Sequence, residues 1–502
     1  MPRVSQRSPF DRQAACPSCG APMTFRFAGA AAQVCKHCKF VVVRSDRNLA
    51  AVGRVADLVD IPSPLTLETT GRWGNEPFMV DGRVQLDRAG APGAPWQEFF
   101  ITFPQSGRWS WVASAQGRWY ATTEAPLPPG GLPPLSALRP GGSVNLGPHG
   151  TWSVAETGRR RVVSAEGELP FVAAPGVATP FADIAGPNGA FGTIDYGDGQ
   201  AIPPKLYLGR QIDPAVMQLD SGAPIEAAQA KVQSVSCPSC GGNLPLVAPE
   251  TAERIVCRYC GMASDFKSGA LQALRPAPRL NVQPVIPLGQ EGYLRGNRVI
   301  CIAFLVRGCT VDGERYRWRE YLIYAGPRVG YLWLMEEDGS WKYITPIAPG
   351  DVQQLGGSVR FRGRTYHQKQ ANFAEVEQVV GELYWRVEVG EQVRAVEYSG
   401  PGGIVSVETA PTEVTVSFCE PMSWGEISKS FALPQNAGPP RMPSFGGSGS
   451  DAPQGASCGT IIFVVIILVV LVIALGFCGV GSGGGGSIGG PSFGGPSFGG
   501  GK

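Results

Sequence analysis

Eight of the thirteen cysteines constrain the fold of this chain most strongly, because they form two sets of paired C-x-x-C motifs. Within each set, a spacer of fifteen or sixteen residues separates the two pairs. Two such turns can place four thiolates around one tetrahedral metal ion, and this spacer suits the β-hairpin of a zinc ribbon. We therefore predict two Zn²⁺ ions, one bound by Cys16, Cys19, Cys35 and Cys38 and the other by Cys237, Cys240, Cys257 and Cys260.

Two other interpretations of these cysteines are disulfide pairs within each set and a thioredoxin-like redox motif. A reducing compartment, which is expected from the topology below, disfavours disulfides. A thioredoxin-like C-x-x-C needs a βαβ context that the sequence lacks. A site closed by four thiolates has no open coordination position, so we expect the metal to be structural rather than catalytic.

The two cysteine sets lie 221 residues apart, and the sequence after them repeats as well. The matched residues at an offset of 222 are Trp96 and Trp318, Glu98 and Glu320, and Trp119 and Trp341. At an offset of 214, Gly167-Glu168 matches Gly381-Glu382. The offset falls because the first copy carries a longer Pro-rich connection, residues 125–142, which we expect to be a surface insertion. The chain is therefore a tandem duplication.

Both copies predict short β-strands, because segments rich in Val, Thr, Trp and Phe are broken at short intervals by Gly and Pro. The expected fold class is mainly β, with two duplicated β-rich domains, each preceded by a small zinc ribbon, and one C-terminal transmembrane helix. The strands are plainest in the second copy, where they are predicted at 298–306, 316–324, 329–335, 341–344, 384–389, 393–398, 404–408 and 413–418.

Near the C-terminus, residues 461–475 are all apolar and residues 458–480 carry no charge, which is long enough for a helix to span a bilayer. A buried core helix is the alternative, but a linker precedes this run and a Gly-rich tail follows it. The N-terminal residues contain no apolar run of the kind found in a secretory signal. We expect a single-pass membrane protein with the bulk of the chain in the cytosol.

These patterns divide the chain into nine predicted parts. They are a disordered N-terminus (1–15), zinc ribbon 1 (16–44), β-rich domain 1 (45–215), a linker (216–236), zinc ribbon 2 (237–266), β-rich domain 2 (267–433), a flexible linker (434–457), the transmembrane helix (458–480) and a disordered Gly-rich tail (481–502).

The Cys-Pro-x-Cys-Gly knuckle, the second C-x-x-C, the Trp-x-Glu-aromatic strand and the Gly-x-Trp turn together resemble the domain-of-unknown-function family numbered 4178, here in two tandem copies. The resemblance implies a bacterial protein, often encoded beside membrane-stress genes, and it implies no known activity or catalytic residues. It places the expected membrane anchor in the bacterial cytoplasmic membrane.

Three classes of function remain open on the sequence. The first is a membrane-tethered, non-enzymatic zinc-binding scaffold or regulatory protein with a protein partner. The second is an enzyme acting on a small or lipid-derived substrate through the recurring glutamates, although such residues more often point outward from a strand or pair with an Arg. The third is nucleic-acid binding through the ribbons, for which the basic residues are Lys36, His37, Lys39, Arg254 and Arg258. A net charge of +2 and the lack of a broad basic patch make that third class unlikely on the sequence.

Overall fold

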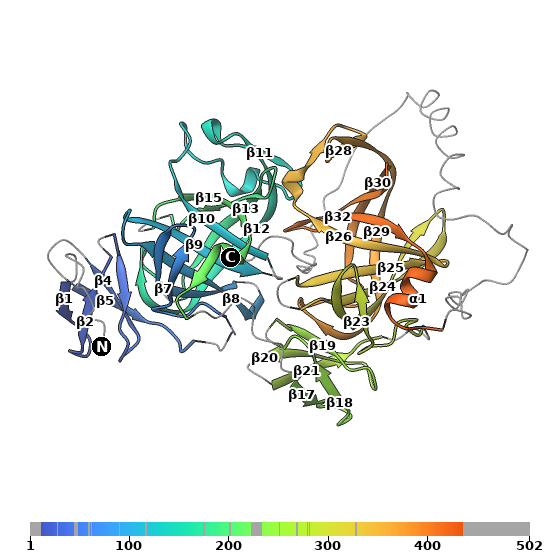
Figure 1. Cartoon of the computed structure of the whole chain (residues 1–502), viewed down its shortest axis with the longest axis horizontal. Helices are drawn as coiled ribbons and strands as arrows, with labels where there is room; N and C mark the ends of the chain where they lie inside the picture. The colour runs from blue at the N-terminus through green and yellow to red at the C-terminus, as the bar shows by residue number, and fades with distance from the viewer. Residues whose placement is uncertain are drawn as a thin grey trace, which may run out of the picture.

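The structure is a computed structural model that describes residues 12–434, except for gaps at 28, 45–48, 59–60, 62, 90, 116–117, 174–175, 200–201, 222–232, 250, 268–269, 279, 281 and 327–328. Within this part the chain is mainly β and contains one short α-helix (Figure 1), which confirms the mainly β fold class. No helix in the described part is long and apolar enough to cross a membrane. The predicted span, residues 458–480, lies outside the described residues.

The first half of the chain forms a closed antiparallel barrel of eight strands, here called barrel 1. In order around the ring they are β7 (Glu76–Arg88), β8 (Ala91–Phe103), β9 (Arg108–Ala115), β10 (Arg118–Ala125), β15 (Lys205–Ile212), β14 (Ala190–Asp195), β13 (Ala178–Ala185) and β12 (Thr151–Leu169), which pairs back with β7. Three short strands extend this sheet: β6 (Thr70–Trp73), β11 (Ser143–Asn145) and β16 (Met217–Leu219).

The second half repeats this ring as barrel 2. Its strands, in the same order, are β23 (Asn297–Val311), β24 (Glu314–Tyr324), β25 (Tyr331–Glu337), β26 (Ser340–Ile347), β32 (Val414–Met422), β31 (Gly403–Thr409), β30 (Gln392–Gly400) and β29 (Arg364–Leu383), which closes on β23. The short strands here are β22 (Glu291–Leu294), β27 (Val352–Gln354) and β28 (Ser358–Phe361).

Strand register confirms that the matched sequence landmarks occupy matched places. Glu98 pairs with Ala113 on β9, and Glu320 pairs with Met335, which is 222 residues further along the chain. The two Gly-x-Trp residues also agree, because Trp119 pairs with the last residue of β15 and Trp341 with the last residue of β32. The duplication therefore extends to the pairing of individual residues across the sheet.

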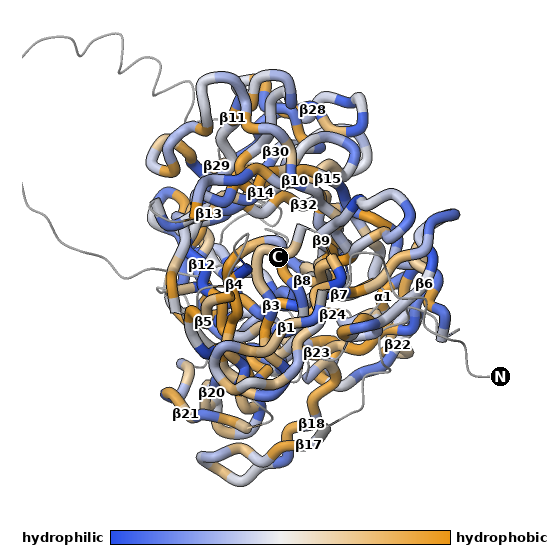
Figure 2. The backbone as a smooth tube through the Cα atoms, turned by 90° about the vertical axis from the view of Figure 1, so that its left-hand side faces the viewer, coloured by the Kyte–Doolittle hydropathy of each residue, from blue (hydrophilic) through white to orange (hydrophobic). Residues whose placement is uncertain are grey.

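Each barrel is packed by aromatic and β-branched side chains that alternate with polar residues along the strands, as expected where one face of a strand is buried. Figure 2 shows apolar and polar residues intermixed along most strands. In barrel 2, Tyr321 and Trp341 are fully buried and stack with their ring centroids 5.4 Å apart. Burying one such side chain contributes about 1.5–3 kcal/mol, so these rings hold the barrel wall together.

Each cysteine set belongs to a small ribbon that continues into its own barrel. Ribbon 1 contains the hairpin β1 (Arg12–Ala15) and β2 (Pro22–Phe25), and then β3 (Ala32–Val34), β4 (Phe40–Arg44) and β5 (Leu49–Arg54). Ribbon 2 contains β17 (Gln233–Ser236), β18 (Asn243–Leu246), β19 (Arg254–Val256), β20 (Met262–Lys267) and β21 (Ala270–Pro276). Strand β3 pairs with the end of β12, and β19 pairs with the end of β29, so each ribbon extends the barrel sheet.

The two barrels lie side by side (Figure 1) and contact each other through polar groups. The backbone N–H of Thr157 donates to the carbonyl of Thr412 at 2.8 Å, and Glu156 and Glu413 form a single β-bridge. The guanidinium of Arg88 lies 2.9 Å from the Glu156 carboxylate. Burial and the neighbouring Glu156 raise the pKa of Glu413 well above its usual range.

Two expectations from the sequence are wrong in the fold, and one long strand was missed. Residues 384–389 are not a strand, because the chain bends at Tyr384 and Trp385, which turn their rings into the core. The preceding twenty-residue strand β29 was not predicted, since its first half is polar. The Pro-rich connection at 125–142 is not only a surface insertion, because Leu138 is buried against the core of barrel 1.

A short helix, α1 (Trp424–Ser430), follows β32 and was also not predicted. Ser423 and Glu426 form a reciprocal capping box at its start, which satisfies two backbone N–H groups that the first turn leaves free. The S-x-x-E signal was present in the sequence, but the helix is too short to show a periodic apolar face.

Candidate metal centres and barrel cavities

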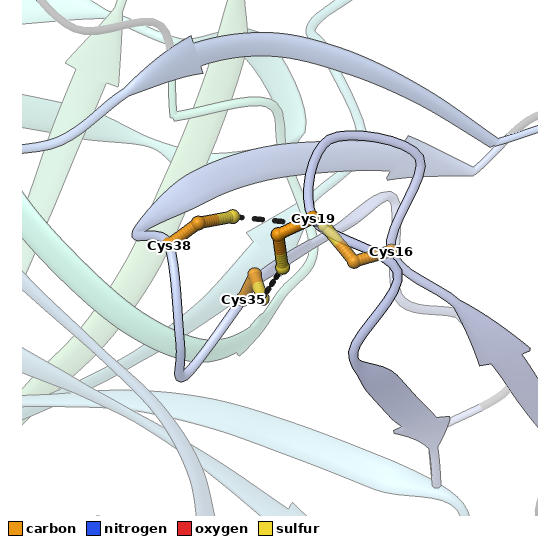
Figure 3. Close-up of side chains that lie close together, drawn as sticks. All are labelled: Cys16, Cys19, Cys35 and Cys38. Carbon is orange, nitrogen blue, oxygen red and sulfur yellow. Dashed lines mark hydrogen bonds between the residues drawn. The ribbon is translucent and has the colours of Figure 1, made fainter.

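The four cysteines of each set converge from two tight turns. Figure 3 shows this for the set in ribbon 1. In ribbon 1 the Sγ atoms of Cys16 and Cys38 are 3.7 Å apart, as are those of Cys19 and Cys35. In ribbon 2 the corresponding distances are 3.6 and 3.8 Å, between Cys237 and Cys260 and between Cys240 and Cys257. A tetrahedral ion with Zn–S bonds of about 2.3 Å separates its sulfurs by about 3.8 Å, so the donor sets fit zinc.

Disulfides do not account for this geometry, because an S–S bond is about 2.0 Å long and none of these eight cysteines forms one. The turns are closed by backbone hydrogen bonds, with Gly20 N–H donating to the Cys16 carbonyl and Gly241 N–H to the Cys237 carbonyl. The N–H of Phe40 lowers the pKa of the Cys38 thiol to about 6, and that of Met262 does the same for Cys260. Both shifts favour the thiolate that a metal ion binds.

The recurring pair Glu168 and Glu382 fastens each ribbon to its barrel. Both oxygens of Glu168 accept backbone N–H groups of Arg26 and Phe27, at 2.6 and 2.9 Å. Those of Glu382 accept from Val247 and Ala248, at 2.6 and 2.7 Å. Burial raises the pKa of Glu168 to about 7, although the two N–H groups oppose the shift. These glutamates have a structural role and are not free for acid/base chemistry.

The other recurring pair, Glu98 and Glu320, points into the barrels, which corrects the expectation of an outward side chain. Each lies beside a buried arginine, as the paired alternative predicted. The Glu98 carboxylate is 3.7 Å from Arg160, and that of Glu320 is 3.3 Å from Arg307. A tryptophan two residues earlier donates its indole N–H to each glutamate, Trp96 at 3.2 Å and Trp318 at 2.7 Å.

A second carboxylate completes the group in each barrel, and the sequence comparison did not find it. Asp195 lies 2.8 Å from Arg160, and Glu408 lies 3.0 Å from Arg307. These acids occupy equivalent places, because Asp195 pairs with Phe181 and Lys205, whereas Glu408 pairs with Ala395 and Thr415 at the matching positions. Their offset is 213 residues rather than 214, which hid the match.

The arginine, by contrast, comes from a different strand in each barrel. Arg160 lies on β12, and its equivalent on β29 is Ala374. Arg307 lies on β23, and its equivalent on β7 is Leu86, since both face the matched tryptophan of the next strand. Burial alone would lower the pKa of each arginine, but the flanking carboxylates raise it, so both stay charged.

These charged groups line one cavity in each barrel. The cavity of barrel 1 encloses about 710 Å³ and that of barrel 2 about 650 Å³, part of it open to solvent. Glu408 is 21% exposed, whereas Arg307 and Glu320 are 10% and 11% exposed, so the barrel 2 cavity opens on the Glu408 side.

The basic residues considered for nucleic-acid binding do not form one surface. Arg254 is buried and bonds Asp265 at 2.9 Å and the Val387 carbonyl at 2.9 Å. Lys36 is exposed but pairs with Glu68 at 2.9 Å. The arrangement therefore gives no support to groove or phosphate recognition by the ribbons.

Comparison with known proteins agrees with the resemblance for one of the two copies. Residues 287–423 match the family described as Domain of unknown function (DUF4178). The match covers the ring of barrel 2 and its cavity, whereas barrel 1 is linked to it here by topology and register and not by the family match. No curated protein and no solved structure matches the chain. The similarity to a family of unknown function thus applies to the second barrel.

Proposed function

We propose that this chain is a membrane-tethered, non-enzymatic scaffold in which two structural zinc ions hold the ribbons and two duplicated barrels present binding surfaces to a protein partner. The observation that carries the proposal is the pair of four-cysteine clusters with sulfur spacings of 3.6–3.8 Å. Sites closed by four thiolates stabilise a fold rather than activate a substrate.

The tether is inferred from the uncharged run at residues 458–480, and the bacterial cytoplasmic membrane is the proposed location. The cytosolic placement of the barrels agrees with eight cysteines that must stay reduced to bind zinc. The enzyme alternative is less well supported, because Glu168 and Glu382 are used to hold backbone N–H groups.

Elemental analysis and affinity capture test the two parts of the proposal separately. Full-length protein, purified in detergent, is expected to contain two zinc ions per chain. Crosslinking in intact membranes followed by capture is expected to recover a protein partner with the parent chain. A C237S/C257S variant tests whether the partner needs ribbon 2, with Cys301→Ser as the control, since Cys301 is a buried cysteine outside both clusters. Absence of metal would overturn the zinc assignment, and failure to recover any partner from the crosslinked membranes would overturn the scaffold role.

A further inference from the structure

The cavity of barrel 2 differs from that of barrel 1 in the charge of its lining. Its ionisable residues are Arg307, Glu320, Glu391 and Glu408, which set three carboxylates against one guanidinium. The cavity of barrel 1 is lined by two carboxylates and by Arg160, Arg161 and Lys205. Two of the positions that differ are Val177 of barrel 1, which corresponds to Glu391, and Lys205, which corresponds to Thr415. The third is Arg161, which has no basic counterpart in the lining of the barrel 2 cavity.

The apolar part of the barrel 2 lining includes two indole rings. Trp333 and Trp385 lie with their centroids 5.5 Å apart at an interplanar angle of 55°. Aromatic faces attract organic cations, and the attraction grows where water is excluded. Excess carboxylate and aromatic faces in the same cavity therefore favour the same kind of ligand.

The same cavity also holds two hydrogen-bond donors that have no acceptor among the described residues. They are the Nε of Arg307 and the Nε1 of Trp385, and both residues are buried. Buried donors are rarely left without a partner, because each costs free energy. An oxygen acceptor held in the cavity would give these two donors the partner that the described residues do not supply.

We propose that the cavity of barrel 2 binds a small amine that carries an oxygen acceptor on an apolar body. The ammonium group lies among Glu320, Glu391 and Glu408, the apolar body packs on Trp333 and Trp385, and the oxygen accepts from Arg307 and the Trp385 indole. This site is separate from the zinc centres and does not depend on the proposed scaffold role.

Ligand binding to the full-length, zinc-loaded protein in detergent tests the site, with 2-amino-1-phenylethanol as the probe. Isothermal titration is expected to give one site per chain. Benzylamine, which lacks the hydroxyl group, binds more weakly, and benzyl alcohol and benzoate bind about tenfold more weakly still or not at all, because they lack the charged hydrogen bond. Equal binding of benzoate, or no binding of either amine at millimolar concentration, would overturn the proposal.

Matched variants locate the binding in barrel 2. E391V and T415K each install the barrel 1 residue, and each is expected to weaken the probe about tenfold. D195N alters the equivalent carboxylate of barrel 1 and is expected to leave the affinity unchanged. Circular dichroism checks that each variant is folded, and the E408Q variant, which changes only a partly exposed side chain, gives a second measure. Binding that survives both E391V and E408Q, or that D195N abolishes, contradicts the assignment.

Discussion

Barrel 1 and barrel 2 each hold one arginine beside two carboxylates, but the arginine comes from a different strand in each barrel. Both place a deep glutamate and a second carboxylate at matched positions, yet Arg160 comes from β12 and Arg307 comes from β23. These strands are not equivalent but are neighbours in the ring, since β12 pairs with β7 and β29 with β23. The physical requirement is thus a cation between a buried glutamate and a second, partly exposed acid, and either of two adjoining strands can supply it.

The largest expected effect concerns the ribbons, where the two halves should behave alike. C16S/C35S and C237S/C257S should each lower the zinc content from two ions to one, because two of four ligands are lost. Structural zinc is worth about 10–16 kcal/mol in finger peptides, so the affected ribbon should unfold. Elemental analysis and limited proteolysis of each ribbon give the measurement. A variant that keeps both ions would show that the two ribbons differ.

The next largest effect is expected on the stability of barrel 2 when its buried arginine is removed. R307L leaves Glu320 and Glu408 without their cation and should lower the free energy of unfolding of barrel 2 by about 3–5 kcal/mol. Adding A374R places an arginine where barrel 1 has Arg160, and part of the loss should return. Denaturant unfolding, followed by the tryptophan fluorescence of barrel 2, measures the free energy of unfolding of R307L with and without A374R.

The control for that experiment is R298A, because Arg298 pairs with Glu291 on the surface and is 79% exposed. It should change the free energy of unfolding by at most about 0.5 kcal/mol. If R307L changed the free energy of unfolding as little as R298A, the Arg307 ion pairs would not contribute to stability. If A374R gave no rescue, the two strands would not be interchangeable.

A smaller effect is expected at the glutamates that hold the ribbons. E168Q and E382Q each replace one accepting oxygen by an NH₂ group that faces a backbone N–H, which should cost about 1–3 kcal/mol. Hydrogen exchange should speed up at Arg26 and Phe27 in the first variant and at Val247 and Ala248 in the second. Unequal losses of stability in the two variants would mean that one ribbon is also held by other contacts. The control is E124Q, which changes an exposed glutamate.

An effect of similar size is a dependence of stability on pH that barrel 2 has and barrel 1 lacks at this position. Burial raises the pKa of Glu391 to about 7, from an ordinary value of 4.5. A raised carboxyl pKa stabilises the fold below about pH 4.5, and this contribution is lost as the pH rises through 7. Because of Glu391, the free energy of unfolding of the parent should fall by about 1–3 kcal/mol between pH 5 and pH 8. The E391V variant should lack this fall.

Thermal unfolding of parent and E391V at both pH values checks this prediction. Other groups with raised pKa values, such as Glu168 and Glu253, are common to both proteins and cancel in the comparison. An identical pH profile in the two proteins would mean that Glu391 ionises freely in the cavity.

Features that depend on the spacing of residues along the chain could be predicted from the sequence, whereas features that depend on which strands pair could not. The cysteine sets and the matched Glu98 and Glu320 follow from constant offsets, and the structure brings each set together. Asp195 and Glu408 were not found, because the turn that precedes their strand is one residue shorter in barrel 2, from Ser399 to Ile404, than in barrel 1, from Ala185 to Phe191. Arg307 was not found either, because Leu86 occupies the equivalent position in barrel 1. Only the strand pairing shows that Arg160 supplies the guanidinium there from the neighbouring strand.

The strand shared by ribbon and barrel has a consequence for how the protein arose. β12 pairs with β7 as far as Gly167 and with β3 from Gly167 onward, and β29 does the same at Gly381. Both glycines have positive φ, and a side chain there would collide with the facing backbone. A copy cut between ribbon and barrel would leave one sheet without its edge. The unit that is repeated in this chain therefore contains ribbon and barrel together, because each ribbon is part of the sheet of its own barrel.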